Sequence, residues 1–221
     1  MGEIGESDMS KEMVRLLLIR HGVTEWNDGG RLMGRMPIGL APHGRTQIER
    51  LAASLAAEPL EAIVASPQRR TQETAEIIAA PHSLAVQPDD GLDEVWLSER
   101  WQGRTFEELR GEPDLVALRA DPTYACEWIE SIALVQQRVI ATMERLCEGH
   151  NSGTIALVSH GDPLRILLAH ALSMQLKDFR SLIVNTGSLS VVERYRSRFQ
   201  VRLLSWKPAG TLEVALSASA V

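Results

Sequence analysis

The feature that most constrains the fold is a set of short, nearly continuous apolar runs, each closed by Gly, Pro or Ser. The first three runs are Met13–Ile19, Leu60–Ala65 and Thr154–Val158. Runs of this length and character are typical of parallel strands buried on both faces of a sheet. A fourth run, Leu182–Val192, contains an Asn-Thr-Gly break, and we expect its end to pair with Phe199–Leu204 as a hairpin.

Amphipathic helical patterns separate these runs. Apolar residues recur at helical spacing in Thr46–Ala57, Gln68–Ala79, Ser131–Cys147 and Pro163–Leu172. Strands that alternate with helices form right-handed βαβ units. The sequence therefore predicts an α/β fold of three layers, in which helices cover both faces of a doubly wound, mostly parallel sheet.

Residues 80–130 interrupt this alternation and hold three of the five tryptophans, Trp96, Trp101 and Trp128. We expect an irregular insertion with one or two short helices over the carboxyl ends of the strands, although its aromatic residues could simply fill a secondary core. The domain would span residues 13–206. Residues 1–12 are interpreted as a disordered extension or cloning remnant, and residues 207–221 as a tail.

Composition excludes several classes of protein. The 221 residues are 44% hydrophobic, enough for a full core, and the net charge of −6 argues against nonspecific nucleic-acid binding. No apolar run approaches the ~20 residues of a membrane span, and the polar N-terminus is unlike a secretory signal. Cys126 and Cys147 form no CxxC pair, which favours a reducing compartment. We expect a cytoplasmic protein that binds neither nucleic acid nor membrane.

Histidine and arginine side chains follow each of the first three predicted strands. Arg20-His21-Gly22 follows the first strand, Ser66 to Arg70 follows the second, and His160-Gly161 follows the third. Ligands of open α/β sheets bind outside the carboxyl ends of the strands, so these residues should converge on one crevice. Guanidinium groups and helix N-termini favour an anion there, and phosphate is the natural guest.

The same residues make a poor metal site, because no HxH, HExxH or CxxC spacing is present and arginines repel a divalent ion. We therefore expect no metal and no other cofactor. A neutral histidine can instead attack phosphorus and form a phosphohistidine, which divides the transfer into two easier steps. Cationic groups would stabilise the transition state, and one carboxyl group could give and then take a proton.

Several segments together resemble a known family over residues 14–192. Arg20–Asn27 is similar to the RHGxTxxN signature of the histidine phosphatase superfamily, the phosphoglycerate-mutase-like branch 1. Further similarities are Ser66–Ala75 to its SPLxRAxQTA motif, Gly34–Gly44 to its GRxDxPLTxxG loop, Glu130, Ser131 and Arg138 to its GES…R element, and Val158–Gly161 to its second histidine motif.

The resemblance implies a role for each matching residue. His21 would be the nucleophile, and Glu94 in Leu92-Asp93-Glu94 would be the general acid and base. His160 would take part in catalysis and also bind phosphate. Ser98 stands where the family usually has glycine, so Asp93 and Glu99 remain alternatives for the acid. The implied phosphate-binding residues are Arg20, Asn27, Arg70 and His160, although Asn27 could equally serve an ordinary cap or turn.

These observations predict a phosphomonoester hydrolase that acts on a small phosphorylated metabolite through a phosphohistidine. One alternative is a phosphoglycerate mutase, but mutases of this superfamily carry ESxWN after RHG, where this chain has Val23-Thr24-Glu25-Trp26-Asn27. Another is a catalytically silent module that binds a phospho-ligand. Specificity should reside in residues 27–42 and 96–128, where a second acid group or solvent could meet Arg35, Arg100 and Arg104. An exposed edge strand near Phe199–Leu204 would permit a homodimer.

The absence of a metal-ligand pattern generates a first prediction. Incubation with excess EDTA should leave the initial rate of p-nitrophenyl phosphate hydrolysis unchanged, because the chemistry is assigned to histidine, arginine and carboxyl groups. A large loss of rate that Zn²⁺ or Mg²⁺ restores would contradict this assignment.

Overall fold

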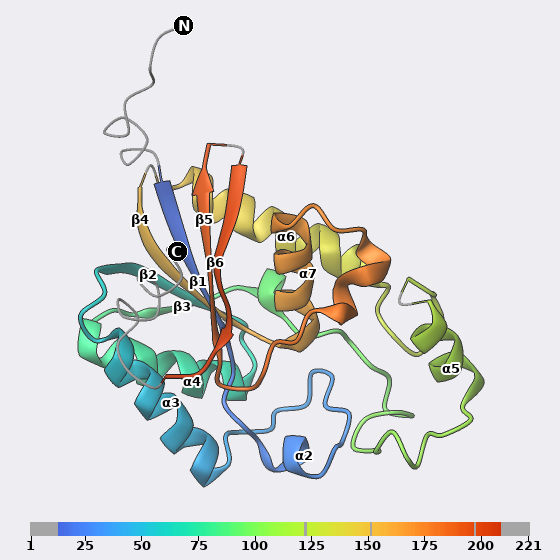
Figure 1. The fold of residues 1–221 in the computed structure, drawn as a ribbon. Helices are drawn as coiled ribbons and strands as arrows, with labels where there is room; N and C mark the ends of the chain where they lie inside the picture. The colour runs from blue at the N-terminus through green and yellow to red at the C-terminus, as the bar shows by residue number, and fades with distance from the viewer. Residues whose placement is uncertain (1–12, 122, 151, 197, 209–221) are drawn as a thin grey trace, which may run out of the picture.

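The structure, a computed structural model, describes residues 13–121, 123–150, 152–196 and 198–208. Its centre is a six-stranded sheet in the order β3-β2-β4-β1-β5-β6 (Figure 1). The strands are β1 (Met13–Arg20), β2 (Leu60–Ala65), β3 (Val86–Pro88), β4 (Gly153–Ser159), β5 (Leu189–Tyr195) and β6 (Arg198–Trp206). The extension predicted at residues 1–12, and residues 209–221 of the predicted tail, lie outside the described residues.

The predicted mostly parallel sheet is confirmed. Strand β1 pairs in parallel with β4, and β2 pairs in parallel with both β4 and β3. Strand β5 is antiparallel to β1 and to β6, so the hairpin expected at the end of the domain is present. The carboxyl ends of β1, β2 and β4 consequently meet at one edge of the sheet.

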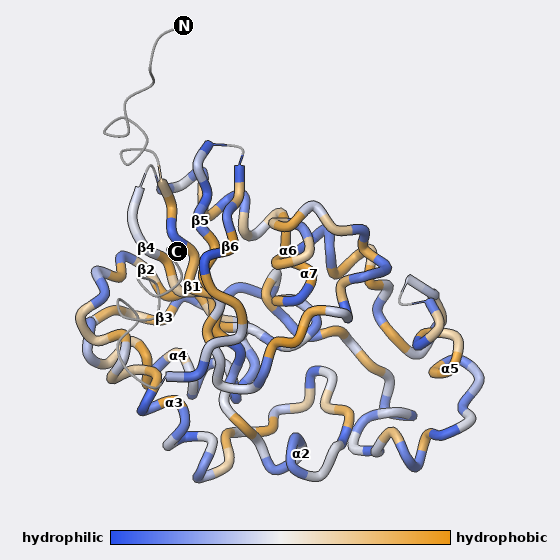
Figure 2. Tube along the Cα trace, in the orientation of Figure 1, coloured by the Kyte–Doolittle hydropathy of each residue, from blue (hydrophilic) through white to orange (hydrophobic). Residues whose placement is uncertain are grey.

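Helices cover both faces of the sheet, which confirms the three layers. The helices α3 (Pro42–Leu55) and α4 (Arg69–Ala79) pack on one face, whereas α6 (Ile132–Glu148) and α7 (Gly161–Ala171) pack on the other (Figure 1). Successive residues of a strand point to opposite faces. Leu16 of β1 therefore joins the core under α6 and α7, and Leu17 joins the core under α3 and α4. Figure 2 shows the resulting apolar strands between helices with hydrophilic outer residues.

Some local structure differs from the expectations. The apolar run 182–192 begins as a loop after a 3-10 helix, η4 (Leu176–Ser181), and becomes strand only at Leu189. Strand β3 and the short helix α2 (Glu25–Asp28) were not predicted. Pro88 is compatible with β3 because that strand lies at the edge of the sheet, where a missing N–H leaves no ladder partner unpaired.

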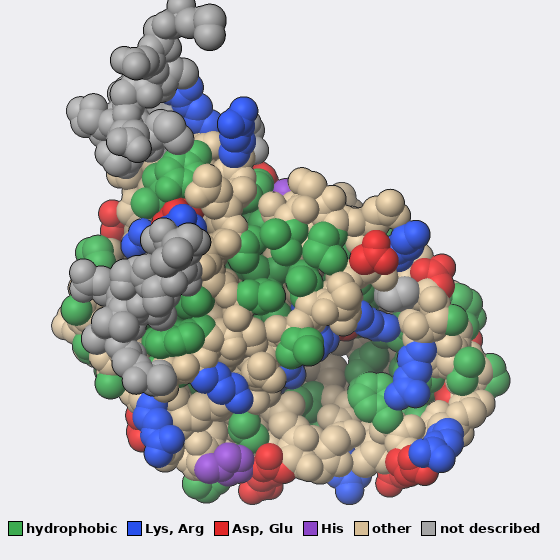
Figure 3. Space-filling view, viewed as in Figure 1, with side chains coloured by type: hydrophobic (Ala, Val, Ile, Leu, Met, Phe, Trp, Pro, Cys, Tyr) green, Lys and Arg blue, Asp and Glu red, His purple; other side chains and the backbone are tan. Residues whose placement is uncertain are grey.

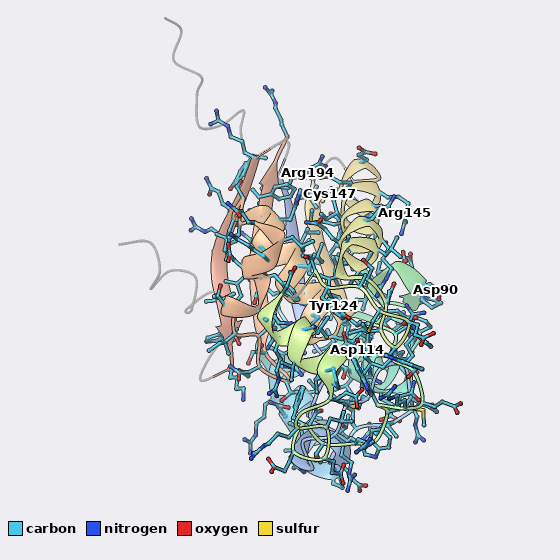
Figure 4. The ribbon with its side chains drawn as sticks, turned by 90° about the vertical axis from the view of Figure 1, so that its right-hand side faces the viewer. Asp90, Asp114, Tyr124, Arg145, Cys147 and Arg194 are labelled. Carbon is cyan, nitrogen blue, oxygen red and sulfur yellow. The ribbon has the colours of Figure 1, made fainter. Side chains whose placement is uncertain are left out.

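Residues 80–130 contain the expected short helices, but they also supply strand β3. Their helical elements are η2 (Ala80–His82), η3 (Asp90–Leu92) and α5 (Pro113–Ala120). Trp101 is completely buried, whereas Phe106 remains 46% exposed. Tyr124 donates a hydrogen bond to Asp114 at 2.8 Å, and the two side chains lie together along α5 (Figure 4). Some aromatic side chains of this segment therefore belong to the core, and others remain exposed.

Two loops beyond the strand ends are joined by backbone hydrogen bonds. Leu32 N–H donates to Arg104 O at 2.9 Å, and Gly103 N–H donates to Leu32 O at 2.8 Å. Arg31 and Thr105 form an isolated antiparallel bridge beside these bonds. The loop after α2 and the segment before α5 thus form one continuous wall.

The loop after β1 packs directly on the start of α3, and glycine is needed on both sides. A Cβ at Gly22 would lie 2.8 Å from Gly44 O, and a Cβ at Gly44 would lie 2.0 Å from Val23 O. Real side chains do not approach backbone this closely. The two glycines therefore fix the path of the chain immediately after His21.

Candidate active site

The carboxyl ends of the parallel strands bring the predicted histidines and arginines together. Arg20 ends β1 and His21 follows it, His160 follows β4, and Arg70 lies in the first turn of α4 after β2. The rings of His21 and His160 are 5.3 Å apart between centroids and meet edge to face at 60°. Both histidines are essentially buried, with exposures of 1% and 0%.

Two arginines flank the histidines, and the negative charge of Glu94 acts on both without forming a direct salt bridge. Arg70 is 0% exposed and donates to the carbonyl oxygens of Gly34 at 2.9 Å and Met36 at 3.1 Å. Arg20 donates to Val184 O at 2.6 Å. Neither guanidinium forms a salt bridge with a carboxylate of the described residues, and the Nε atoms of both are buried without a hydrogen-bond partner. Burial lowers the pKa of Arg70 to about 10.

Burying a charge without a counter-ion is costly, and buried polar atoms normally have partners. The two arginines therefore favour an anion at the carboxyl ends of the strands. A phosphoryl group fits this place chemically, because its oxygens accept the forked hydrogen bonds that guanidinium groups donate.

The geometry fixes which ring nitrogen of His21 keeps its lone pair. Nδ1 lies 2.8 Å from Gly22 O. A carbonyl oxygen can only accept, so Nδ1 carries the proton and Nε2 keeps its lone pair. Burial lowers the pKa of His21 well below its ordinary value, and the cations of Arg70 and Arg20 lower it further. The imidazole is consequently neutral at physiological pH, as a nucleophile must be.

His160 is oriented by a buried relay that sequence reasoning missed. Ser66 Oγ donates to Asp93 Oδ1 at 2.6 Å and lies 2.9 Å from His160 Nε2. Because the Ser66 proton is used on the carboxylate, Ser66 Oγ accepts from Nε2–H of His160. Nδ1 of His160 is buried without a partner. Burial, followed by the Arg70 cation, lowers the pKa of this histidine well below its ordinary value.

Among the three candidate acids, Glu94 alone lines a cavity that borders the site; Arg20 and Asn27 also line this cavity, whereas His21, Arg70 and His160 do not. It is half-buried, and its Oε1 accepts a hydrogen bond from Val95 N–H at 2.9 Å. Burial raises its pKa, and the negative charge of Asp162 raises it further, whereas Arg70 opposes the change. Asp93 is engaged with Ser66 and Gln68, and Glu99 is exposed and does not line the cavity.

The backbone that carries Glu94 is fixed by Arg138 of α6. The Arg138 guanidinium donates to the carbonyl oxygens of Gly91, Asp93 and Glu94 at 3.0, 2.7 and 3.2 Å. It is itself held by Glu130 at 3.0 Å. Arg138 and Glu130 are two of the three residues that the sequence relates to the family's GES…R element, the third being Ser131, and here they position the loop of the candidate acid.

Asn27 caps a helix and also lines the cavity, so its position is compatible with both roles considered for it. Its Oδ1 accepts hydrogen bonds from Thr24 N–H and Thr24 Oγ, each at 3.0 Å, which completes a capping box on α2. The residue also lines the cavity. Its side-chain nitrogen, Nδ2, has no partner among the described residues and remains able to donate to a ligand.

A cavity of about 450 Å³ opens from Arg20, Asn27 and Glu94 toward the insertion. Figure 3 shows the surface hollowed between the regions of α2 and α5, with hydrophobic and cationic side chains at its edge. The sequence had assigned specificity to the two loops that supply most of this lining. It gave no role to Asp162, which also lines the cavity and binds Arg165 at 2.9 Å; its position directly after His160-Gly161 was the available signal.

Two further properties concern the described residues as a whole. Within the described ranges, no cluster of three or more His, Cys, Asp or Glu side chains could hold a metal ion. The helices of that same part of the chain are too short or too polar to cross a membrane.

An α/β sheet whose strand ends bring two buried histidines together with two buried arginines is the arrangement expected of an enzyme of phosphoryl transfer. The chain belongs to the histidine phosphatase superfamily (branch 1), whose family model matches residues 16–207. The family and the class of enzyme predicted from the motifs are therefore confirmed.

Similar proteins carry phosphatase names. Phosphoserine phosphatase 1 of Hydrogenobacter thermophilus is 32% identical over 84% of this chain and 89% of its own length. The structure of a putative alpha-ribazole-5'-P phosphatase from Escherichia coli aligns with a TM-score of 0.82 at 27% identity, covering 90% of this chain and 98% of that one. Phosphoserine phosphatase from Entamoeba histolytica, in complex with 3-phosphoglyceric acid, aligns with a TM-score of 0.78 at 26% identity, covering 86% and 96%.

The neutral buried histidines generate a prediction about stability. Below about pH 6.5 the unfolded chain protonates His21 and His160, whereas the folded chain keeps them neutral because their pKa values are lowered. The unfolded state then binds more protons, so the free energy of unfolding should fall as the pH decreases, by about 1.4 kcal/mol per pH unit for each histidine. The raised pKa of Glu94 has the opposite effect, because it makes the free energy of unfolding rise as the pH decreases.

Urea unfolding between pH 7 and 5 measures this slope. His21→Gln should flatten it by about one histidine's share. Equal slopes for the wild type and His21→Gln would show that His21 is protonated in the folded protein.

Proposed function

We propose that the protein is a phosphomonoester hydrolase that acts on small phosphorylated metabolites through a phosphohistidine at His21. The observation that carries the proposal is the pair of unneutralised guanidinium groups, Arg20 and Arg70, beside a buried imidazole whose Nε2 is free. Electrostatic stabilisation by such preorganised donors is usually the largest single contribution to catalysis.

In the first step, His21 Nε2 attacks phosphorus, a nitrogen–phosphorus bond forms, and the bond between phosphorus and the ester oxygen breaks. The departing alkoxide needs a proton, which the carboxyl group of Glu94 supplies. Burial and Asp162 raise the pKa of this carboxyl, so a larger fraction is protonated at neutral pH than for an exposed glutamate.

The transferring phosphoryl group is stabilised by Arg20, Arg70 and His160, with the amide of Asn27 as a further donor. A bound phosphoryl dianion favours the protonated form of His160, whose Nδ1–H then donates to a phosphoryl oxygen. The relay through Ser66 to Asp93 stabilises that imidazolium from its other nitrogen.

In the second step, Glu94, now a carboxylate, takes a proton from water. The water oxygen bonds to phosphorus, the nitrogen–phosphorus bond breaks, and inorganic phosphate leaves with His21 neutral again. The phosphatase names of the relatives support hydrolysis over the mutase alternative, and an assay with a bisphosphorylated glycerate would distinguish them.

The covalent intermediate can be trapped. Rapid acid-free quenching with ³²P-labelled substrate should yield a base-stable, acid-labile phosphoprotein in the wild type and none in His21→Ala, whose kcat/KM should fall at least about a thousandfold. His43→Ala serves as the matched control and should retain both label and rate. A His21→Ala variant that stays folded and still turns over at the wild-type rate would refute the nucleophile.

The role of Glu94 is tested by the acidity of the leaving group. Glu94→Gln should lower kcat/KM for alkyl phosphates by about 10²–10⁴-fold, the usual contribution of general-acid catalysis. The loss should be much smaller for p-nitrophenyl phosphate, because nitrophenolate leaves without a proton. Glu99→Gln is the control and should leave both values unchanged; a loss in Glu94→Gln that is the same for both esters would exclude a general-acid role.

A further inference from the structure

We propose that the outer part of the cavity is a subsite for a bulky apolar alcohol group, so that the enzyme prefers phosphate esters of such alcohols over esters of charged acids. We name this surface the apolar subsite and define it by Trp26, Leu32, Phe106, Leu115, Leu118 and Ile129. The inference rests on the proposed function, because it concerns the part of the substrate attached to the transferred phosphoryl group.

The first argument is the continuity of the cavity. The volume of about 450 Å³ that contains Arg20 and Glu94 also contains every member of the apolar subsite. Sites for small organic ligands typically have ~300–1,000 Å³ and mostly apolar walls with few polar groups. A phosphate group held at Arg20 therefore directs its ester substituent along apolar side chains.

The second argument is that aromatic surface remains exposed within this cavity. Phe106 is 46% exposed although it lies in a lining that also includes the nearly buried Leu115 and Leu118. The Arg119 guanidinium lies over the Phe106 ring, 4.8 Å from its centre, and this contact holds the ring in place. A fixed, solvent-exposed ring inside a cavity gains binding energy when an apolar group covers it.

The third argument concerns the cations that could recognise a second acid group. Arg35 binds Glu130 at 3.1 Å, Arg100 binds Glu112 at 2.5 Å, and Arg104 donates to Glu108 O at 2.8 Å. None of these three arginines lines the cavity. They are therefore unsuited to binding a substrate carboxylate.

The arginines that do line the outer cavity are also engaged. Arg165 and Arg180 share Asp162, at 2.9 and 3.5 Å. Arg31 donates to Gly103 O at 2.6 Å. Arg31 and Arg119, which lies over Phe106, keep their positive charge, so the apolar walls, and not an absence of cations, carry the inference.

The test is a series of esters whose primary alcohols have similar acidity, so that differences in kcat/KM report binding of the alcohol group. Hexyl phosphate and 2-phenylethyl phosphate should exceed ethyl phosphate by at least about tenfold, at roughly two- to fourfold per added methylene. O-phosphoserine and 3-phosphoglycerate are similar in size to these esters but carry a carboxylate. Their kcat/KM should be lower than that of hexyl phosphate.

Variants locate the preference. Phe106→Ala should reduce the ratio of kcat/KM for 2-phenylethyl over ethyl phosphate by about fivefold or more, and Phe106→Leu should restore most of that ratio. Because Phe106 is partly exposed, these variants should fold. Val116→Ala, at a residue of α5 that is 54% exposed and does not line the cavity, is the control and should keep the wild-type ratio.

The outcomes separate the two proposals. Three results would overturn the apolar subsite and leave the proposed hydrolysis intact. They are a kcat/KM that does not rise with the apolar size of the ester, a higher kcat/KM for the charged esters, and a loss of kcat/KM in Phe106→Ala that is equal for every ester. Absence of both hydrolysis and trapped phosphohistidine for every ester would overturn the proposed function and the subsite together.

Discussion

The buried positive charge of Arg70 is the constraint on which the rest of the site depends. Its guanidinium is fully buried, bonded to backbone carbonyl oxygens and free of any salt bridge with a described carboxylate. Such a charge favours anions and disfavours further cations. It therefore helps to keep His21 and His160 neutral, and it makes the cleft ready for a phosphoryl group before any substrate arrives.

The carboxylates are distributed so that they do not cancel this charge. Asp93 is directed to Ser66, Glu130 is held by Arg138 and Arg35, and Asp162 is shared by two arginines of the cavity wall. Glu94, the proposed acid, lines the cavity, and burial raises its pKa. Several of these supports join segments distant in sequence, such as Asp93 with Ser66 and Arg35 with Glu130, and such contacts help a rigid fold to position reactive groups.

Sequence patterns predicted the three layers and the principal strands and helices in their order along the chain. They also predicted that His21, Arg70 and His160 converge, because buried strands and the loops that follow them have recognisable local sequences. They did not predict β3, whose three residues are too few for a periodic signal. They also missed the link between Ser66, Asp93 and His160, since residues 66 and 160 are joined only by tertiary packing. The sequence left open whether the aromatic residues of the insertion fill a core, because the exposure of a residue such as Phe106 depends on where the insertion folds.

The paired backbone of residues 31–32 and 103–105 has a consequence for how this scaffold can diversify. In the chain, one of the paired loops follows Asn27 and the other precedes Phe106, and both of these residues line the cavity. Replacing side chains that line the cavity would change which ligands bind, while the backbone hydrogen bonds between the two loops stay in place. Lengthening or shortening either loop would shift both ends at once, so inherited changes in selectivity are expected as point substitutions more than as insertions or deletions.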